Sequence, residues 1–259
     1  MLDSLYAGAL EDANARQQSL SSDALEKLAL SAPPAIDAGS FLRAGPGINV
    51  IAEIKRASPS KGHLAEILDP AALGSLYQAT GASAISVLTE QRSFLGSLED
   101  LAKVRAAVSI PILRKDFIAN EYQVLDARAY GSDIVLLIAA GLTQSVLVRL
   151  KAMIESLGMS ALIETHNEAE VEMASSIGSE LVGINARDLA TFETDRDLFE
   201  KLVHLLPADC IKVAESAVRG AEDVKAYAAA GADCVLVGEA LVTGNAGELI
   251  RAFTQIAKA

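Results

Sequence analysis

From Asn49 onward, short apolar runs alternate with longer segments whose apolar residues recur at helical spacing. Apolar runs of about four to eight residues between turn signals are typical of strands buried in a parallel sheet. The candidate strands are Val50–Ile54, Ala84–Leu88, Pro111–Arg114, Ile134–Ile138, Ala161–Ile163, Leu181–Ile184, Ile211–Ala214 and Cys234–Val237. The helices predicted between them include Asp69–Gln78, Leu98–Ala107, Glu121–Ala129, Gln144–Leu157, Glu168–Ile177 and Ala221–Ala230. This alternation predicts an α/β protein with a (β/α)8 TIM-barrel fold.

A weak internal repeat supports the count of strands. Gly81, Gly131, Gly178 and Gly231 each end a predicted helix and lead into a strand, and they lie roughly fifty residues apart. That spacing corresponds to two βα units. An open doubly wound sheet usually carries GxGxxG after its first strand, and the corresponding turn here, RASPSKG, lacks that pattern. The repeat therefore favours a closed barrel.

The first part of the chain has a different pattern. Leu2 to Leu30 looks helical, with a break at Gln18–Ser22 and Ser22 as a plausible N-cap. A loop rich in proline and glycine follows, with the short turn SFLR inside it. This segment offers too little apolar surface for a core of its own. We therefore predict a single domain over 1–259, with an N-terminal helical extension over 1–47 and the barrel over 48–259.

Five charged side chains stand where four of the strand patterns close or end. They are Glu53, Lys55, Lys115, Glu164 and Glu215. A charge at the last position of a buried strand is costly unless the chain exits there into a polar site. Each one alone could be a structural ion pair or a solvated charge. Together they indicate one rim of the barrel, the end at which TIM-barrel enzymes carry out their chemistry.

Two of these charges suggest acid–base chemistry. Side chains alternate along a strand, so Glu53 and Lys55 point the same way and can form an acid–base pair at the mouth. A lysine near other cations has a lowered pKa, and we expect this for Lys115 as a general acid. At the end of strand six, Asn185 can orient a substrate hydroxyl, whereas Arg187 can simply pair with a nearby carboxylate.

An anion site is predicted at the same rim. The loop KRASPSKG after the first strand offers Ser58 among small hydroxyls, a cation and a glycine, although an ordinary loop has the same composition. The ends of strands seven and eight are where barrels often bind phosphate through backbone N–H groups. Ser216 and Gly238 are the candidates there.

Composition excludes several classes of function. The net charge of −12 and the absence of Trp argue against binding of nucleic acid or anionic membranes. No apolar run approaches the length of a bilayer span, and the N-terminus lacks a signal-peptide pattern. Cys210 is expected to be exposed, Cys234 to lie in the core, and the three histidines to lie at the surface or in loops, so no metal site is predicted. We expect a cytoplasmic protein that binds a small anionic substrate.

The motifs IAEIKRASPSKG, FLGSLEDL, LRKDFI, ALIE, INARDL, AES and LVGEAL are present in the chain. Together they resemble the indole-3-glycerol phosphate synthase family of tryptophan biosynthesis, from about Asn49 to Leu241, and the N-terminal segment is similar to the family's extra helix. The resemblance implies a carboxy-lyase without cofactor or metal. Its phosphorylated substrate would be 1-(2-carboxyphenylamino)-1-deoxyribulose 5-phosphate, and its products indole-3-glycerol phosphate, carbon dioxide and water.

The resemblance also implies roles for individual residues. Lys115 would be the main general acid, Glu164 would serve the proton transfers of dehydration, and Lys55 would pair with the anthranilate carboxylate. Glu53 would tune those lysines, and Asn185 with Glu215 would hold substrate hydroxyls. Phe94 and Phe117 would flank the aromatic ring, and Ser58, Ser216 and Gly238 would hold the phosphate. Arg187, Ala217 and Glu239 complete the expected substrate-binding set.

The chain departs from the family pattern at Ala217, where the family usually has glycine after Glu-Ser. If the backbone there requires a positive φ, alanine costs about 1 kcal/mol or more and weakens phosphate affinity.

Three alternatives stay open at this stage. They are a barrel resembling phosphoribosylanthranilate isomerase, an aldolase that uses a lumen lysine as nucleophile, and a non-catalytic phosphate-binding barrel. For assembly, we expect a monomer or a weak homo-oligomer.

Overall fold

Eight parallel strands close into a barrel in the order β1-β10-β9-β8-β7-β6-β5-β4. A computed structural model of the chain describes residues 1–188, 191 and 193–259. The barrel strands are β1 (Asn49–Ile54), β4 (Ala84–Leu88), β5 (Ile112–Lys115), β6 (Ile134–Ile138), β7 (Ser160–Thr165), β8 (Leu181–Asn185), β9 (Ile211–Glu215) and β10 (Cys234–Val237). Each lies within two residues of its predicted bounds, so the predicted TIM barrel is confirmed.

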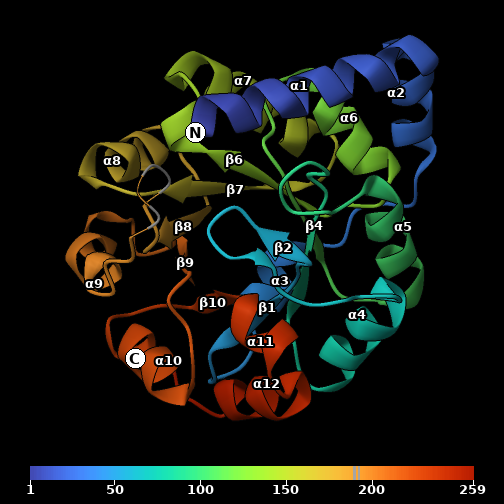
Figure 1. Ribbon diagram of the computed structural model, residues 1–259. Coiled ribbons are helices and arrows are strands. Elements are labelled where there is room, and N and C mark those ends of the chain that lie inside the picture. The colour runs from blue at the N-terminus through green and yellow to red at the C-terminus, as the bar shows by residue number, and fades with distance from the viewer. Residues whose placement is uncertain (189–190, 192) are drawn as a thin grey trace.

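Helices surround the strands as an outer ring (Figure 1). Those predicted from helical spacing are α4 (Pro70–Ala79), α5 (Leu98–Ala107), α6 (Glu121–Ala129), α7 (Gln144–Ser156), α8 (Glu168–Ser176) and α10 (Ala221–Ala229). The pattern did not delimit the short elements η1 (Ala139–Gly141), α9 (Leu198–Leu202), η2 (Val203–Leu205) and α11 (Glu239–Thr243), nor α12 (Ala246–Thr254).

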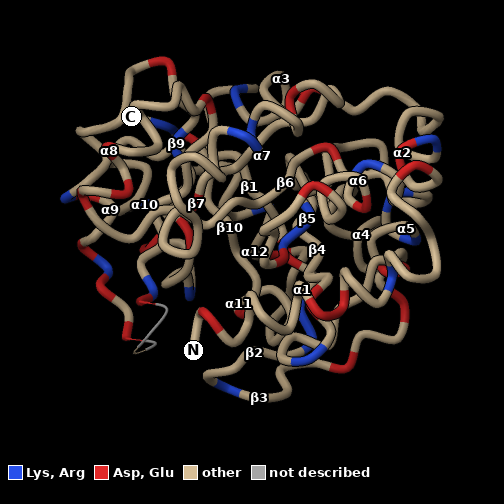
Figure 2. The backbone as a smooth tube through the Cα atoms, turned by 90° about the horizontal axis from the view of Figure 1, so that it is seen from above, with Lys and Arg blue, Asp and Glu red and all other residues tan. Residues whose placement is uncertain are grey.

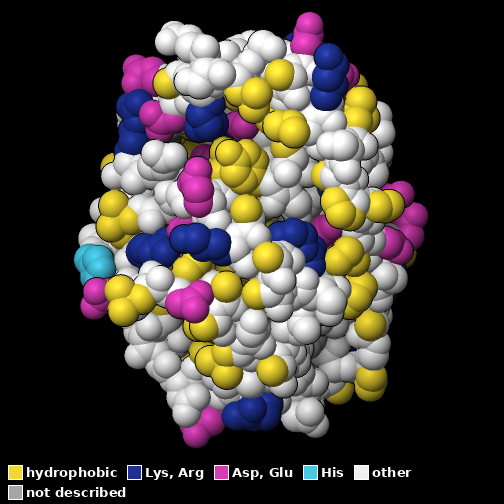
Figure 3. Space-filling model, turned by 90° about the vertical axis from the view of Figure 1, so that its right-hand side faces the viewer, with side chains coloured by type: hydrophobic (Ala, Val, Ile, Leu, Met, Phe, Trp, Pro, Cys, Tyr) yellow, Lys and Arg dark blue, Asp and Glu magenta, His cyan; other side chains and the backbone are white. Residues whose placement is uncertain are grey.

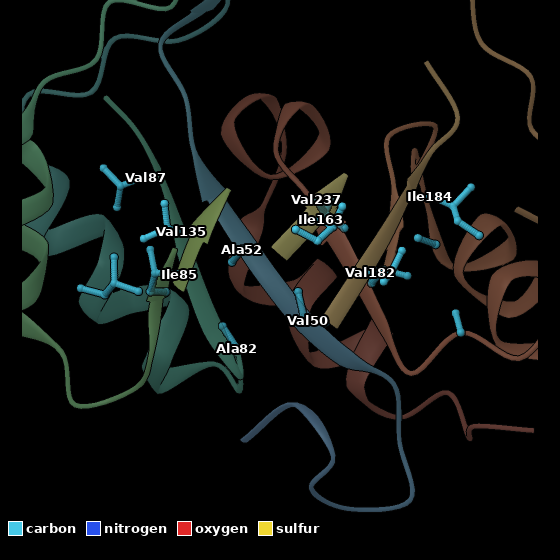
Figure 4. Packing of buried hydrophobic residues seen from close by; sticks show 14 of the residues in the cluster. Val50, Ala52, Ala82, Ile85, Val87, Val135, Ile163, Val182, Ile184 and Val237 are labelled. Carbon is cyan, nitrogen blue, oxygen red and sulfur yellow. The ribbon is translucent and has the colours of Figure 1, made fainter. Parts of the chain in front are cut away.

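Alternating side chains on the strands build two apolar layers. Val50 and Ala52 of β1 belong to the large cluster between strands and helices. Figure 4 shows side chains such as Val87 and Ile184 pointing from their strands toward the surrounding helices. Ile51, which alternates with them, belongs to a second cluster that fills the lumen. Glu53 has the parity of Ile51, so strand alternation directs its charge inward at the end of β1.

The N-terminal extension forms α1 (Leu2–Ser19), α2 (Ser22–Ser31) and α3 (Ala38–Leu42). Helix α1 crosses the barrel beside α6 and α7 at the top of Figure 1. The predicted break between α1 and α2 is confirmed, but the N-cap of α2 is Ser21 rather than Ser22. The Ser21 hydroxyl accepts the backbone N–H of Ala24, which fixes the start of the helix one residue earlier.

Ion pairs of two arginines attach α1 to the barrel. Arg16 donates to Asp126 Oδ2 of α6 from Nε at 3.1 Å and from Nη2 at 2.8 Å. Asp126 is buried, and its Oδ2 lies 4.0 Å from Nη1 of the fully buried Arg114. At the surface, Arg92 pairs with Glu11 and Asp12 of α1.

The two ends of the barrel are built differently. The hairpin of β2 (Ala57–Ser58) and β3 (Gly62–His63) lies at one end together with α11, and α3 lies at the other (Figure 2). The strands run toward the end with the hairpin, so their carboxyl ends and the predicted charges lie there. This end is called the mouth below.

The two cysteines are both buried. Cys234 begins β10 and is fully buried, as expected. Cys210 was expected to be exposed, but this prediction is wrong, because its side chain packs into the apolar layer between strands and helices and is only 3% exposed.

The surface view in Figure 3 shows cationic and anionic side chains interspersed, with hydrophobic side chains in small groups. This face has no broad cationic belt of the kind that binds a polyanion. Among the described residues, no helix has the length and apolar composition needed to cross a membrane.

We predict that Asp126→Ala lowers the free energy of unfolding by about 3 kcal/mol, because Arg114 then stays buried beside one partner fewer and α1 loses its attachment. Urea denaturation measures the change. The control is Arg92→Ala, which removes the exposed ion pairs of the same helix and is expected to cost much less, because solvent screens them. Equal losses in the two variants would contradict this reading.

Candidate active site

A cavity of about 810 Å³ opens at the mouth of the barrel. Every residue predicted for the site lines it: Glu53, Lys55, Ser58, Phe94, Lys115, Phe117, Glu164, Asn185, Arg187, Glu215, Ser216, Ala217, Gly238 and Glu239. They come from the ends of different strands and the loops that follow. The barrel closure therefore brings together residues that are scattered over most of the sequence.

Lys115 lies at the centre of the polar side of this cavity. Its ammonium forms an ion pair with Glu164 Oε2 of β7 and lies 2.8 Å from Glu215 Oε2 of β9. Both carboxylates are only 2% exposed, and the lysine side chain is 14% exposed. One ammonium thus contacts two buried carboxyl groups, from the strands on either side of β8.

These ion pairs contradict the expectation that the pKa of Lys115 is lowered. Burial lowers the pKa of the ammonium, but the carboxylates of Glu164, Glu215 and Glu53 outweigh burial and raise the pKa above its ordinary value. The expected lowering is therefore wrong, because the nearest charges are anions rather than cations. Lys115 is therefore protonated at neutral pH before substrate binds.

The two carboxylates beside Lys115 differ in protonation. Burial opposes ionisation of Glu164, but Lys115 and His166 outweigh it and hold the pKa of Glu164 well below its ordinary value. Burial also raises the pKa of Glu215, where the opposing effect of Lys115 is partly cancelled by Glu164, and the pKa reaches about 8. Two carboxyl groups with divergent pKa values can divide the roles of base and acid.

Glycine on β8 makes room for Glu215. A Cβ at Gly183 would collide with Glu215 Oε1, so any larger residue would push that carboxylate away from Lys115. Sequence reasoning missed this role. The signal for it was a glycine inside the apolar run LVGIN, which indicates a close approach of another group.

Glu53 and Lys55 form the predicted acid–base pair. Lys55 Nζ lies 2.7 Å from Glu53 Oε1, and Glu53 is buried while the lysine is partly accessible. Ser86 of β4, which pairs with Glu53 in the sheet, donates to Glu53 Oε2 at 3.4 Å. A Cβ at Gly238 would collide with the same carboxylate, so this glycine keeps the pair in place from the β10 side.

Asn185 links two sides of the site. Its Nδ2 donates to Glu164 Oε1 at 3.0 Å, and its Oδ1 accepts the Ser216 hydroxyl at 2.7 Å. The backbone N–H of Arg187 donates to the same Oδ1 at 3.0 Å. The amide is thereby fixed in one orientation between the carboxylate cluster and the loop after β9.

Aromatic rings form the apolar side of the cavity. The ring centroids of Phe94 and Phe117 lie 6.2 Å apart, and Tyr6 of α1 meets Phe117 edge-on at 5.6 Å. The loop that carries Phe94 is held by the buried Glu90, which accepts three backbone N–H groups from residues 92, 93 and 94. Sequence reasoning missed Tyr6 and the apolar lining from Leu88, Leu136 and Ile138.

The opposite side offers groups suited to an anion. Ser58, Ser216, Ala217 and Gly238 line the cavity together with Arg187. Ser216 and Ala217 adopt left-handed φ values of 66° and 62°, so the condition under which alanine is costly at position 217 is met. Sequence reasoning missed the cations Arg196 and Arg219, which also line this part.

The loop after β1 closes over this side. Lys61, at the tip of the β2–β3 hairpin, forms an ion pair with Glu239. Arg187 lies between them, with Nη1 donating to Ser60 Oγ at 3.4 Å and Nη2 3.9 Å from Glu239 Oε2. Arg56 anchors the base of the loop through the Ile67 carbonyl and Asp100.

His166 lies in a loop, as expected, although its side chain is not at the surface. It follows β7 directly, but its side chain is only 10% exposed and stands between Glu164 and Glu170. Its position two residues after Glu164 was the available signal. Across residues 1–188, 191 and 193–259, no group of three or more His, Cys, Asp or Glu is placed to hold a metal ion.

A closed β/α barrel with lysines and carboxylates converging on one apolar-walled cavity defines the class of TIM-barrel enzymes. The sequence model of the indole-3-glycerol phosphate synthase family matches residues 2–253. The chain belongs to the indole-3-glycerol phosphate synthase family.

Relatives with that name support the assignment along the whole chain. One from Leifsonia xyli is 56% identical over 245 residues, which cover 95% of this chain and 94% of the relative. One from Rhodococcus jostii is 55% identical, with 95% and 91% covered, and one from Mycobacterium bovis is 54% identical, with 95% and 90% covered.

A solved structure of N-acetylmannosamine-6-phosphate 2-epimerase from Clostridium perfringens superposes with a TM-score of 0.62 and 16% identity. It covers 87% of this chain and 99% of that chain, and shows a shared fold. The family assignment confirms the predicted class, a carboxy-lyase of tryptophan biosynthesis, and does not favour the alternatives.

We predict that Ala217→Gly raises the free energy of unfolding by about 1 kcal/mol, because glycine relieves the left-handed backbone at this position. Urea denaturation measures it. Ala226→Gly, on the exposed face of α10, is the matched control and is expected to lower stability by about 1 kcal/mol. The interpretation fails if both substitutions change stability in the same direction.

Proposed function

We propose that this chain converts 1-(2-carboxyphenylamino)-1-deoxyribulose 5-phosphate into indole-3-glycerol phosphate, carbon dioxide and water. The observation that carries the proposal is the buried Lys115 ammonium between Glu164 and Glu215, in a cavity that the Phe94–Phe117 pair also lines. In the reaction an aryl carbon attacks a ketone, carbon dioxide leaves the same aryl carbon, and the new hydroxyl leaves as water.

Lys115 is the general acid of ring closure in this proposal. As the ring carbon attacks, negative charge develops on the ketone oxygen, and the ammonium donates a proton to it. Two buried carboxylates keep the ammonium charged until that moment. A positioned acid of this kind contributes about 10²–10⁴-fold to the rate.

Lys55 pairs with the anthranilate carboxylate, and Glu53 fixes the lysine from below at 2.7 Å. Decarboxylation needs this carboxylate removed from water and its ring held against an apolar wall. The partly accessible lysine and the neighbouring Phe94, Phe117 and Leu136 supply both conditions. Lys55 also stands close enough to the cluster to serve as a second acid.

Glu164 removes the proton that must leave during dehydration, because its low pKa keeps it ionised and able to accept a proton at neutral pH. Glu215, which carries a proton more readily, and Asn185 hold the hydroxyl groups of the sugar chain. The division of labour rests on the different environments of the two carboxyl groups.

Ser58, Ser216, Ala217 and Gly238 bind the phosphate, with Arg187 and Glu239 at its margin. The left-handed backbone at Ser216 and Ala217 supports this role, because such conformations turn backbone N–H groups toward a bound anion. The methyl group of Ala217 lies at the cavity wall and weakens this contact relative to glycine.

The lysines and carboxylates supply acid and base for every step, so the proposed reaction uses no cofactor or metal. We further propose a single domain over 1–259 that acts in the cytoplasm as a monomer or weak homo-oligomer. The biosynthetic role of the named relatives supports the location.

We expect Lys115→Ala to lower kcat by about 10²–10⁴-fold, because the acid for the developing alkoxide is lost. Turnover of the carboxyphenylamino-deoxyribulose phosphate is followed by indole fluorescence. Lys225→Ala, on the exposed side of α10, is the control and should leave kcat unchanged.

If Lys115→Ala keeps its kcat, the acid role passes to Lys55, which Lys55→Ala then tests. An unmodified chain that binds the substrate without converting it would overturn the proposed function.

We expect affinity for the phosphorylated product to fall as the pH rises from 7 to 9. Glu215 has a pKa of about 8, so raising the pH through this value adds one negative charge beside the bound anion. Isothermal titration with indole-3-glycerol phosphate measures the effect. In Glu215→Gln this pH dependence should disappear, and its persistence there would assign it to another group.

A further inference from the structure

His166 stands directly behind Glu164 and does not line the cavity. Its Nε2 lies 3.2 Å from Glu164 Oε1, which is ion-pair distance, but it is not aligned for a hydrogen bond. The ring therefore faces this carboxylate oxygen at ion-pair distance. This nitrogen is buried, so water does not screen its interaction with the carboxylate.

Glu170, in the first turn of α8, fixes the ring from the other side. Its Oε2 lies 3.1 Å from Nδ1 of His166 and accepts the backbone N–H of the same residue at 2.8 Å. Its Oε1 accepts Asn167 Nδ2 at 2.6 Å, and Asn167 in turn caps α8. The start of helix α8 thus fixes the Glu170 carboxylate independently of its contact with the His166 ring.

Both ring nitrogens of His166 face carboxylates, and a carboxylate accepts but does not donate. This arrangement favours a proton on each nitrogen. Burial lowers the pKa of His166, but Glu164 and Glu170 outweigh it and raise the pKa to about 10. The side chain is an imidazolium at neutral pH.

Glu164 consequently has a positive partner at each oxygen. Lys115 of β5 occupies Oε2, while His166 and the Asn185 amide face Oε1. The other titratable groups that act on this cluster are Glu53 of β1, Glu215 of β9 and Tyr6 of α1, and none of them supplies positive charge. When Lys115 turns to the substrate, His166 is the cation that stays with Glu164.

We propose that His166, fixed by Glu170, is a positioning residue that keeps the Glu164 carboxylate ionised and oriented for its proton transfers. The proposal rests on the proposed function of Glu164 in dehydration. It predicts that Glu164 binds a proton more tightly when the imidazolium is removed, so that less of it is ionised at low pH. A packing role alone would lower stability and leave the protonation of Glu164 unchanged.

His166→Gln keeps the size and polarity of the side chain and removes its charge. We expect kcat at pH 7 to fall about tenfold, which corresponds to the loss of one charge-assisted contact of roughly 1.4 kcal/mol. KM should change less than about twofold, because His166 does not touch the cavity. The acidic limb of the kcat–pH profile should move up by about one pH unit, because a carboxylate that loses a cation holds its proton more tightly.

Glu170→Gln is the second variant, and it should move the acidic limb in the same direction by a smaller amount. His204→Gln, at an exposed histidine of η2, is the matched control and should change nothing. Thermal unfolding of each variant measures stability separately. An unchanged pH profile in His166→Gln, with or without lost stability, would overturn the proposal.

Nitrogen NMR of labelled histidine gives a readout that does not depend on turnover. The signal missing from His166→Gln identifies the residue, and it should report a doubly protonated ring at pH 8. Glu164→Gln should lower the pH at which this ring loses its proton. A neutral His166 ring at pH 8 would overturn the proposal. Inactivity of the unmodified chain, with the NMR result as expected, would instead count against the proposed function.

Discussion

The arrangement of the other residues at the mouth depends on a buried ammonium that two carboxyl groups share. Taking Lys115, Glu164 and Glu215 out of water costs several kcal/mol per ion unless each finds a partner. The surrounding residues meet that condition one by one. Gly183 makes space for one carboxylate, Asn185 and His166 engage the other, and the sheet register fixes the distances between them.

The same constraint explains why the two carboxylates differ. Glu164 has a positive partner on both oxygens, whereas Glu215 Oε1 has no hydrogen-bond partner within the protein. One group is therefore an anion at neutral pH and the other holds its proton up to about pH 8. Opposite charge preferences within one ion cluster allow acid and base steps to follow each other at the same substrate.

The N-terminal helix is part of the site as well as of the fold. Tyr6 of α1 packs edge-on against Phe117, which follows Lys115 by two residues. Arg16 of the same helix reaches Asp126, which lies beside the buried Arg114 that precedes Lys115. Helix α1 thus supports both walls of the cavity near the lysine, from the aromatic face and from behind strand β5.

The sequence by itself determined the barrel and the location of its chemistry. The spacing of apolar residues differs between strands and helices, so the sequence alone predicts both. Charges at strand ends are too costly to occur by accident in a buried sheet. These patterns, together with the family resemblance, named the site residues, and all of them line one cavity.

Only the tertiary structure decided which charges face each other. The direction of the pKa shift of Lys115, the placement of His166 between two carboxylates, the space left by Gly183 and the burial of Cys210 all depend on contacts between segments far apart in the chain. Local sequence specifies the period of an element and the residue at its end. Electrostatic interaction depends on distance in space, and that distance is fixed by barrel closure and strand register.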